Sequence, residues 1–151
     1  GLGDVYKRQL RYTLQSNESQ SVSLREEMEF ASAYIFLLKM RFENNLQFDI
    51  QIAKSFEDYR LPPMAVQVLI ENAVKHNEIS DRKPLTIHIV TNNEGYLSVS
   101  NDIQPKRTAA SGTGIGLVNL AKRYRLLFKQ DIQITEDKEF SVCIPLIDEV
   151  Q

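Results

Sequence analysis

The spacing of apolar residues along the chain predicts three helices. Between residues 24 and 42, apolar side chains recur at intervals of three and four positions, as on one face of an amphipathic helix. Ser23 stands directly before this run and Glu26 three positions after Ser23, which is the arrangement of a capping box. Similar spacing predicts a second helix over residues 63–76, and a third is expected from a glycine-rich segment to about Phe128.

A second pattern, in which apolar and polar residues alternate, predicts five strands, because successive side chains of a strand point to opposite faces. A turn of the hairpin type, Asn92-Asn93-Glu94-Gly95, separates the second strand from the third. The order of helices and strands predicts a two-layer α/β (α+β) sandwich, in which three helices cover one face of a mixed five-stranded sheet. The expected strands are residues 46–52, 85–91 and 96–101, a short strand at Ile132 and Ile134, and residues 140–146.

Composition narrows the class of protein. Apolar residues make up 42% of the 151 positions and charged residues 25%, so one folded domain is expected. The formal net charge is −2 and no basic stripe is present, which argues against nucleic-acid binding. Cys143 is the single cysteine, so an internal disulfide framework and a cysteine zinc cluster are excluded. No run approaches the roughly 18 apolar residues of a membrane span.

The first residues are expected not to belong to the fold. Residues 1–9, GLGDVYKRQ, lack an initiator methionine, and residues 4–9 match a translated transposon end used in DNA library preparation. We interpret residues 1–9 as a non-native sequencing scar, with a frayed helix end as the alternative. Residues 10–22 are expected to end an upstream helix and form a linker, residues 23–147 to form the domain, and residues 148–151 to form a tail.

One group of polar residues lies on the second predicted helix. Residues three and four positions apart are neighbours on a helix, so Asn72 is expected beside Lys75 and His76, and Glu71 beside Lys75. An amide, a carboxylate and an ammonium group on one face suit Mg²⁺ coordination and the binding of phosphate oxygens. The alternative is a solvated helix face with a Glu71–Lys75 ion pair.

A glycine-rich segment opens the third predicted helix. Its glycines allow backbone N–H groups to approach an anion, and the helix that follows adds the positive end of its dipole. The segment is neither a Walker A motif nor a dinucleotide-binding fingerprint, and a purely structural turn is the alternative. Its candidate phosphate-binding residues are Gly112, Thr113, Gly114, Ile115, Gly116 and Leu117.

Together these two segments resemble the GHKL ATPase superfamily and, within it, the LytS-like sensor histidine kinases. The resemblance extends over roughly residues 10–146. It is carried by Leu61-Pro62-Pro63-Met64 and residues 67–76, by Tyr34 and Arg41-Phe42, by residues 112–119 with Arg123, and by Ile144-Pro145-Leu146.

The resemblance implies the Bergerat (GHKL) fold, with ATP and Mg²⁺ as cofactors. By that resemblance Asn72 ligates Mg²⁺, Lys75 contacts a phosphate, and Glu71 orients or activates the acceptor histidine. The glycines line the phosphates under a lid formed by residues 102–111. His76 is expected to flank the adenine, with a structural histidine at an interface as the alternative.

The sequence departs from the superfamily pattern at the expected adenine contact. Many members carry Asp-x-Gly-x-Gly after the hairpin, whereas this chain has Asn101-Asp102-Ile103. The amide oxygen of Asn101 is still able to accept a hydrogen bond, although a neutral acceptor is weaker than a carboxylate. Asp102 is the alternative acceptor, but strand alternation turns it to the other face.

The expected function is therefore transfer of the ATP γ-phosphate to a histidine on an upstream dimerisation domain. The resemblance implies further partners: a response regulator, often of the LytTR type, and a second copy in a homodimeric parent. It also implies a cytoplasmic domain of a plasma-membrane protein, attached to the membrane only through the upstream region. The alternatives are a pseudokinase that acts as an interaction module, and another GHKL ATPase or protein-serine kinase.

Overall fold

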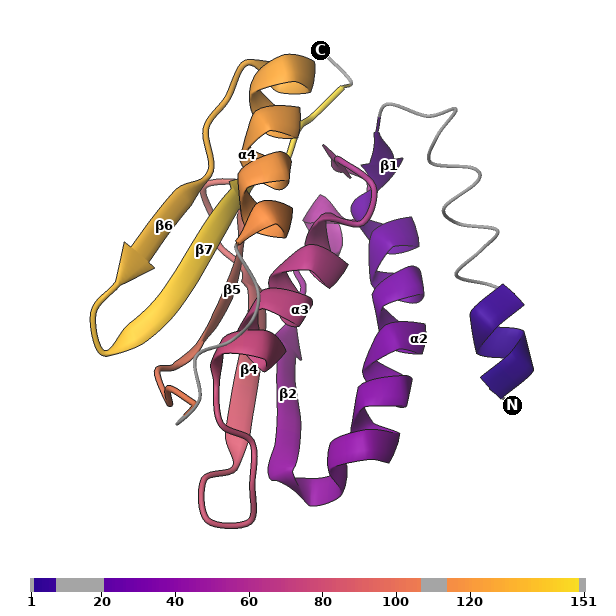
Figure 1. Cartoon of the computed structure of the whole chain (residues 1–151). Helices are drawn as coiled ribbons and strands as arrows, with labels where there is room; N and C mark the ends of the chain where they lie inside the picture. The colour runs from indigo at the N-terminus through magenta and orange to yellow at the C-terminus, as the bar shows by residue number, and fades with distance from the viewer. Residues whose placement is uncertain (1, 8–20, 107–113, 150–151) are drawn as a thin grey trace.

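The computed structural model describes residues 2–7, 21–106 and 114–149 and shows the expected two-layer architecture (Figure 1). Residues 2–7 form a short helical segment. The long helices are α2 (Leu24–Phe42), α3 (Ala65–His76) and α4 (Ile115–Phe128), with 3-10 turns η1 (Glu43–Asn45) and η2 (Lys54–Phe56). The strands are β1 (Val22–Ser23), β2 (Leu46–Gln51), β3 (Arg60–Leu61), β4 (Leu85–Thr91), β5 (Tyr96–Asp102), β6 (Gln133–Glu136) and β7 (Glu139–Pro145).

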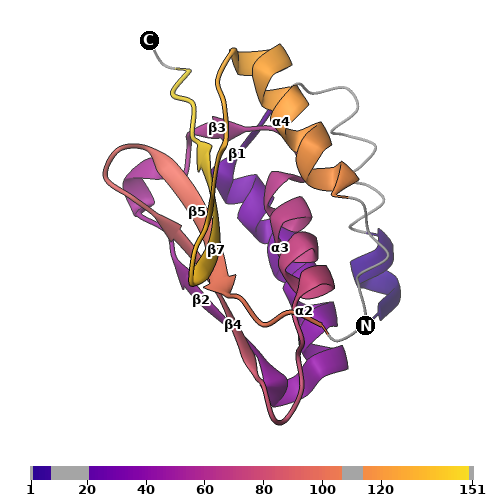
Figure 2. The ribbon, with the colours of Figure 1, turned by 60° about the vertical axis from the view of Figure 1, so that its left-hand side comes forward.

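The main sheet has five strands in the order β2-β4-β5-β7-β6. The β2–β4 pair is parallel and the other pairs are antiparallel, so the sheet is mixed, as predicted. Helices α2, α3 and α4 all lie on one side of the sheet (Figure 2). The prediction of a mixed five-stranded sheet covered on one face by helices is confirmed.

The alternating pattern determines which face of the sheet is buried. Leu85, Ile87 and Ile89 of β4 are at most 1% exposed and pack under the helices. The opposite face carries polar side chains, among them His88, whose Nδ1 lies 2.9 Å from Oδ2 of Asp49 on β2. That hydrogen bond is the main reason the pKa of Asp49 is lowered. His88 therefore lies on the open side of the sheet, where no functional role was expected.

One helix start differs from the predicted position, and another is confirmed within the predicted segment. The second helix begins at Ala65 rather than Pro63, because Met64 adopts a left-handed conformation with φ of 71° and acts as the N-cap. The third begins at Ile115, within the glycine-rich segment that was expected to open it, after Gly114 with φ of 73°. A left-handed residue cannot continue a right-handed helix, so each marks a boundary. The capping box of Ser23 and Glu26 at the start of α2 is present as predicted.

A second, two-stranded sheet was not predicted. In it β1 pairs antiparallel with β3, joining Val22 to Leu61. Each strand has two residues, too few for an alternating pattern to be visible. Within the described residues, no helix is both long enough and apolar enough to span a membrane.

Candidate functional site

Helix α3 carries the first group of candidate residues and is fixed at both ends by buried polar side chains. At its start, the carboxylate of Glu27 on α2 accepts hydrogen bonds from the backbone N–H of Met64 (3.0 Å) and Val66 (2.8 Å). At its end, Asn77 donates to the carbonyl of Ala73 (2.8 Å) and accepts from the backbone N–H of Gln104 (2.8 Å). The helix is thereby tied to α2 and to the segment that follows β5.

The C-terminal half of α3 separates two cavities. Asn72 and His76 line a cavity of about 290 Å³. Glu71 and Lys75 line a second cavity of about 780 Å³, which we call the α2–α3 groove. The four residues therefore lie near one another, as their spacing predicts, but in two pairs that face different spaces.

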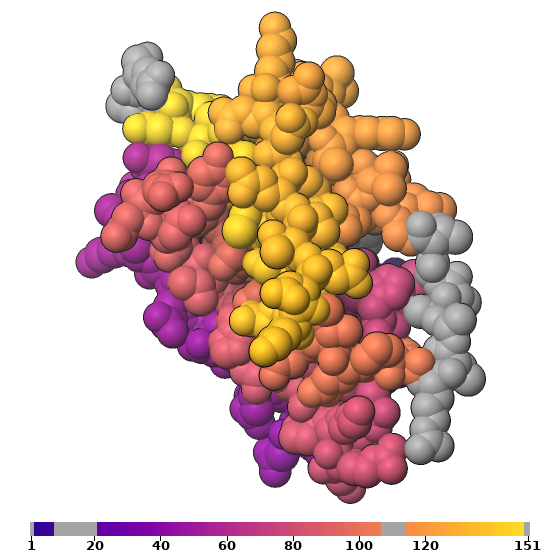
Figure 3. Space-filling model, turned by 90° about the vertical axis from the view of Figure 1, so that its left-hand side faces the viewer, coloured from indigo at the N-terminus to yellow at the C-terminus, as the bar shows by residue number. Residues whose placement is uncertain are grey.

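The smaller cavity lies between α3 and the ends of the central strands. Its other walls come from Asn77, from Ile103 and Pro105 after β5, and from Glu136 and Phe140 of the β6–β7 hairpin. Figure 3 shows the side of the molecule where the hairpin, the segment after β5 and α3 lie next to one another. The cavity thus combines apolar walls with two amides, an imidazole and the carboxylate of Glu136. Apolar walls with a small number of polar groups are typical of small-ligand sites.

Asn101 lies on β5 next to this cavity, directly opposite the cavity residue Phe140 on β7. The side chain is buried on the helix-covered face, and Asp102 is exposed, as alternation predicts. Nδ2 of Asn101 donates to the carbonyl of Asp102 at 2.8 Å. This bond orients the amide and leaves Oδ1 as its hydrogen-bond acceptor.

The α2–α3 groove contains residues from both helices. Oε1 of Glu71 accepts a hydrogen bond from Nε2 of Gln67 at 3.0 Å. In the described structure no ion pair joins Glu71 to Lys75, so the alternative of a simple i,i+4 pair is not supported. Tyr34 of α2 lines the same groove, and its pKa is raised to about 12, first by burial and then by the negative charge of Glu71.

The first turn of α4 lies against α3. A Cβ added to Gly116 would lie 3.4 Å from Cγ1 of Val68, which is one helical turn before Asn72. Gly114 is the N-cap, Ile115 is 62% exposed, and Leu117 packs against the core. The start of α4 is therefore brought near the Asn72 side of α3. Gly112 and Thr113 fall outside the described residues.

Sequence reasoning assigned no role to three residues that organise the site. Asn77, Gln104 and Glu27 hold α3 in place through contacts between segments distant in sequence. The buried Glu27 had a detectable signal, because a carboxylate on the apolar side of a predicted helix requires a partner. Asn77 directly follows the conspicuous run on α3, but only the fold shows its link to Gln104.

A family model and curated relatives both show that the chain is similar to sensor and histidine kinases. A family model described as "Histidine kinase" matches residues 6–46. The chain is 34% identical over 143 residues to Sensor protein LytS of Streptococcus mutans serotype c, covering 84% of this chain and 24% of that protein. It is 28% identical to Sensor histidine kinase BtsS of Escherichia coli strain K12, covering 78% of this chain and 21% of that protein.

Solved structures show the same fold. The nucleotide-free catalytic domain of histidine kinase ThkA superposes with a TM-score of 0.57 at 18% identity, covering 85% of this chain and 99% of that domain. The chain therefore corresponds to about a quarter of the curated relatives and to almost the whole of a solved domain.

Proposed function

We propose that this chain, which belongs to the LytS-like sensor histidine kinases, binds Mg-ATP and transfers its γ-phosphoryl group to a histidine. One observation carries the proposal: α3 directs Asn72 and His76 into a cavity beside Asn101, and Glu71 and Lys75 into the adjoining groove. Phosphoryl transfer requires donor and acceptor to be held together, and the two spaces adjoin along the C-terminal half of α3, where Asn77 lines both.

The residues present fit Mg-ATP. Among the described residues, the side chains of Asn72, Lys75 and His76 have no hydrogen-bond or ion-pair partner, so their polar atoms are available to a ligand. Oδ1 of Asn101 is an oriented acceptor suited to the adenine amino group. Mg²⁺ prefers oxygen ligands and keeps several waters, so the single amide oxygen of Asn72 is sufficient on the protein side.

Each residue then has a defined task. Mg-ATP supplies the phosphoryl group and a cation that neutralises part of its charge. Asn72 holds the metal, Lys75 a phosphate oxygen, and His76 flanks the base. In the transfer, an N–P bond forms to the acceptor imidazole and the P–O bond to ADP breaks, with its electrons leaving on ADP. The other imidazole nitrogen keeps its proton and donates a hydrogen bond to the carboxylate of Glu71, which orients the ring and stabilises the positive charge that it acquires.

The acceptor is a histidine other than the two in this sequence. His88 lies on the open face of the sheet, hydrogen-bonded to Asp49, whereas both cavities adjoin α3 in the helical layer. His76 lines the nucleotide cavity itself. We propose that the acceptor lies on an upstream dimerisation domain of a homodimeric parent. By the same proposal, the parent is anchored in the plasma membrane upstream of this cytoplasmic domain and passes the phosphoryl group to a response regulator of the LytTR type.

A second candidate function is favoured by Asn101, which stands where many members of the GHKL superfamily carry an aspartate. A weaker adenine contact is consistent with a pseudokinase that binds partners without turnover.

Two assays together separate the two candidate functions. Calorimetric titration with Mg-ATP and Mg-ADP measures nucleotide binding, and incubation with γ-labelled ATP and a polypeptide bearing the upstream helices measures phosphoryl transfer. The kinase proposal predicts nucleotide binding, no label on this chain alone, and acid-labile label on the added polypeptide. Nucleotide binding without any transfer favours the pseudokinase, and the absence of both refutes the kinase proposal.

A further inference from the structure

The α2–α3 groove carries an excess of positive charge that the proposed nucleotide site does not use in full. The ion pair between Arg82 and Glu78, at 3.8 Å, neutralises one cation and one carboxylate of the lining. The remaining charges leave a formal excess of two positive charges facing the groove. Its charged lining residues are Arg41, Lys75, Arg82, Lys106, Glu71 and Glu78.

Arg41 and Lys106 are the cations of the groove that have neither an ion-pair partner among the described residues nor a role in the proposed function, and Arg41 is the guanidinium of the two. Its guanidinium carbon lies 4.7 Å from the centre of the Phe42 ring, so the side chain is held in place by a cation–π contact. By contrast, Arg25 on the same helix is paired with Asp58 at 2.6 Å and Glu57 at 3.2 Å. Among the described residues Arg41 has no carboxylate partner, so its planar set of N–H donors is available to an anion.

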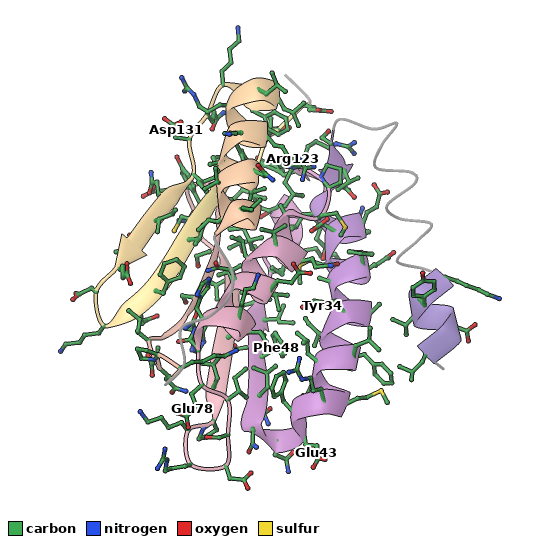
Figure 4. All side chains as sticks on the ribbon, in the orientation of Figure 1. Tyr34, Glu43, Phe48, Glu78, Arg123 and Asp131 are labelled. Atoms are coloured by element: carbon green, nitrogen blue, oxygen red, sulfur yellow. The ribbon has the colours of Figure 1, made fainter. Side chains whose placement is uncertain are left out.

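Among the described residues that line the groove, Glu71 has the one carboxylate without an ion pair. Tyr34 lies beside it on the side of α2 that faces α3 (Figure 4). The Tyr34 hydroxyl is protonated at neutral pH, as in any tyrosine, and its raised pKa extends this to more alkaline pH, so the phenol adds no second negative charge to the groove. The groove therefore offers a guanidinium for phosphate oxygens and a carboxylate for an imidazole N–H.

We infer that the α2–α3 groove binds the phosphorylated acceptor imidazole, with Arg41 holding the phosphoryl oxygens and Glu71 the imidazole N–H. The inference rests on the proposed function, and it adds Arg41 as a residue that contacts the transferred group. A guanidinium fork matches two phosphate oxygens, which makes it a stronger and more specific partner than an ammonium group. The nucleotide cavity, lined by Asn72 and His76, is a separate subsite.

The test uses phosphoimidazole as the probe and the nucleotide-free chain as the protein. Binding is followed by NMR of the backbone amides, with imidazole and inorganic phosphate as separate titrations to distinguish the two halves of the probe. Arg41→Gln is expected to weaken phosphoimidazole binding by about tenfold, since the charge-assisted contact is lost. Arg41→Lys is expected to retain part of the phosphoimidazole affinity. Lys39 is an exposed cation on the same helix outside the groove, so Lys39→Gln is expected to bind phosphoimidazole as the wild type does.

The affinity for Mg-ADP distinguishes this inference from the proposed function. Arg41→Gln is expected to bind Mg-ADP as the wild type does. Wild-type-like phosphoimidazole binding by Arg41→Gln, perturbed amides that lie outside the groove, or an equal loss of Mg-ADP binding overturns the inference. If the wild type binds Mg-ADP normally but does not bind phosphoimidazole, the groove site is refuted and the proposed nucleotide site is not. Phosphoimidazole binding through Arg41 without Mg-ADP binding supports the groove and refutes the proposed nucleotide site.

Discussion

The carboxylate of Glu27 on α2 lies 2.8 Å from the backbone nitrogen of Val66 and accepts its hydrogen bond at the start of α3. Glu27 is fully buried, so it acts as a cap that comes from another helix rather than from the preceding residue. A negative charge there also compensates the positive end of the α3 dipole. The position of the helix that carries Glu71, Asn72, Lys75 and His76 therefore depends on one acidic side chain of α2.

Replacing Glu27 by Gln should destabilise the domain by about 2 kcal/mol or more, because hydrogen bonds to a charged acceptor contribute about 1.5–3 kcal/mol each. Urea denaturation followed by circular dichroism measures the change in the free energy of unfolding. Glu29 is exposed on the same helix, so Glu29→Gln is the matched control and should change the free energy of unfolding little. Equal stabilities of the two variants would show that Glu27 is not a structural cap.

Replacing Asn72 by Ala should remove the Mg²⁺ dependence of ATP binding while the domain stays folded. The residue is half-buried and bonds to no described side chain, so its loss costs little stability. Calorimetric titrations with and without Mg²⁺ should differ by at least about tenfold in the wild type, roughly 1.4 kcal/mol, and coincide in the variant. Asn44 is exposed on η1, so the control variant Asn44→Ala should keep the difference in affinity with and without Mg²⁺. A variant that unfolds instead assigns Asn72 a structural role.

Two substitutions at Asn101 should separate adenine recognition from stability. Asn101→Leu places an apolar side chain of similar size in the buried position and removes the acceptor, so nucleotide binding should be lost. Asn101→Asp keeps an acceptor and should bind at least as well, although the free domain loses the donor to the Asp102 carbonyl and becomes less stable. Affinity and melting temperature are measured on the same samples. Wild-type affinity in the Leu variant would mean that another residue contacts the adenine.

Stability should fall as the pH rises above 10, because the pKa values of Tyr34 and Tyr124 are raised in the folded domain, that of Tyr34 to about 12. Burial is the main cause for both, and Tyr124 also donates to the carbonyl of Pro145 at 2.9 Å. At a pH between the tyrosine pKa of the unfolded chain, about 10, and the raised pKa of the folded domain, the folded state binds more protons than the unfolded state. The stabilising effect is therefore complete below pH 10 and is lost progressively as the pH rises towards the folded-state pKa.

The measurement for the tyrosines is the free energy of unfolding as a function of pH in the wild type and in Tyr34→Phe. The variant should show a shallower decline between pH 10 and 12, since it lacks one of the shifted groups. Tyr6→Phe, at an exposed position, should follow the wild type. An unchanged slope in Tyr34→Phe would contradict the raised pKa.

The sequence predicted those parts of the fold that depend on neighbours along the chain. The burial of Leu85, Ile87 and Ile89 follows from alternation, and the start of α2 follows from the Ser23–Glu26 pair. The parallel pairing of β2 with β4 was not predicted, because pattern reveals a strand but not its partner.

In the candidate site, too, the sequence predicted the relations between residues that are close along the chain. The neighbourhood of Asn72 and His76 follows from helical spacing, and the burial of Asn101 from strand alternation. The division of α3 residues between two cavities required the positions of α2 and the β6–β7 hairpin. The contacts of Glu27 with α3 and of Asn77 with Gln104 join residues 37 and 27 positions apart, a distance over which local pattern carries no information.

The parallel pairing of β2 with β4 has a consequence for the order of folding. Asp49 and His88 lie on these strands and are 39 positions apart, whereas β4–β5 and β6–β7 join neighbours in the chain. Local hairpins close within about 1–10 μs, but a distant pair must first overcome the entropy of closing the intervening loop. That loop contains α3. Nucleotide-binding competence should therefore be acquired at the slow closing step, after the hairpins have formed.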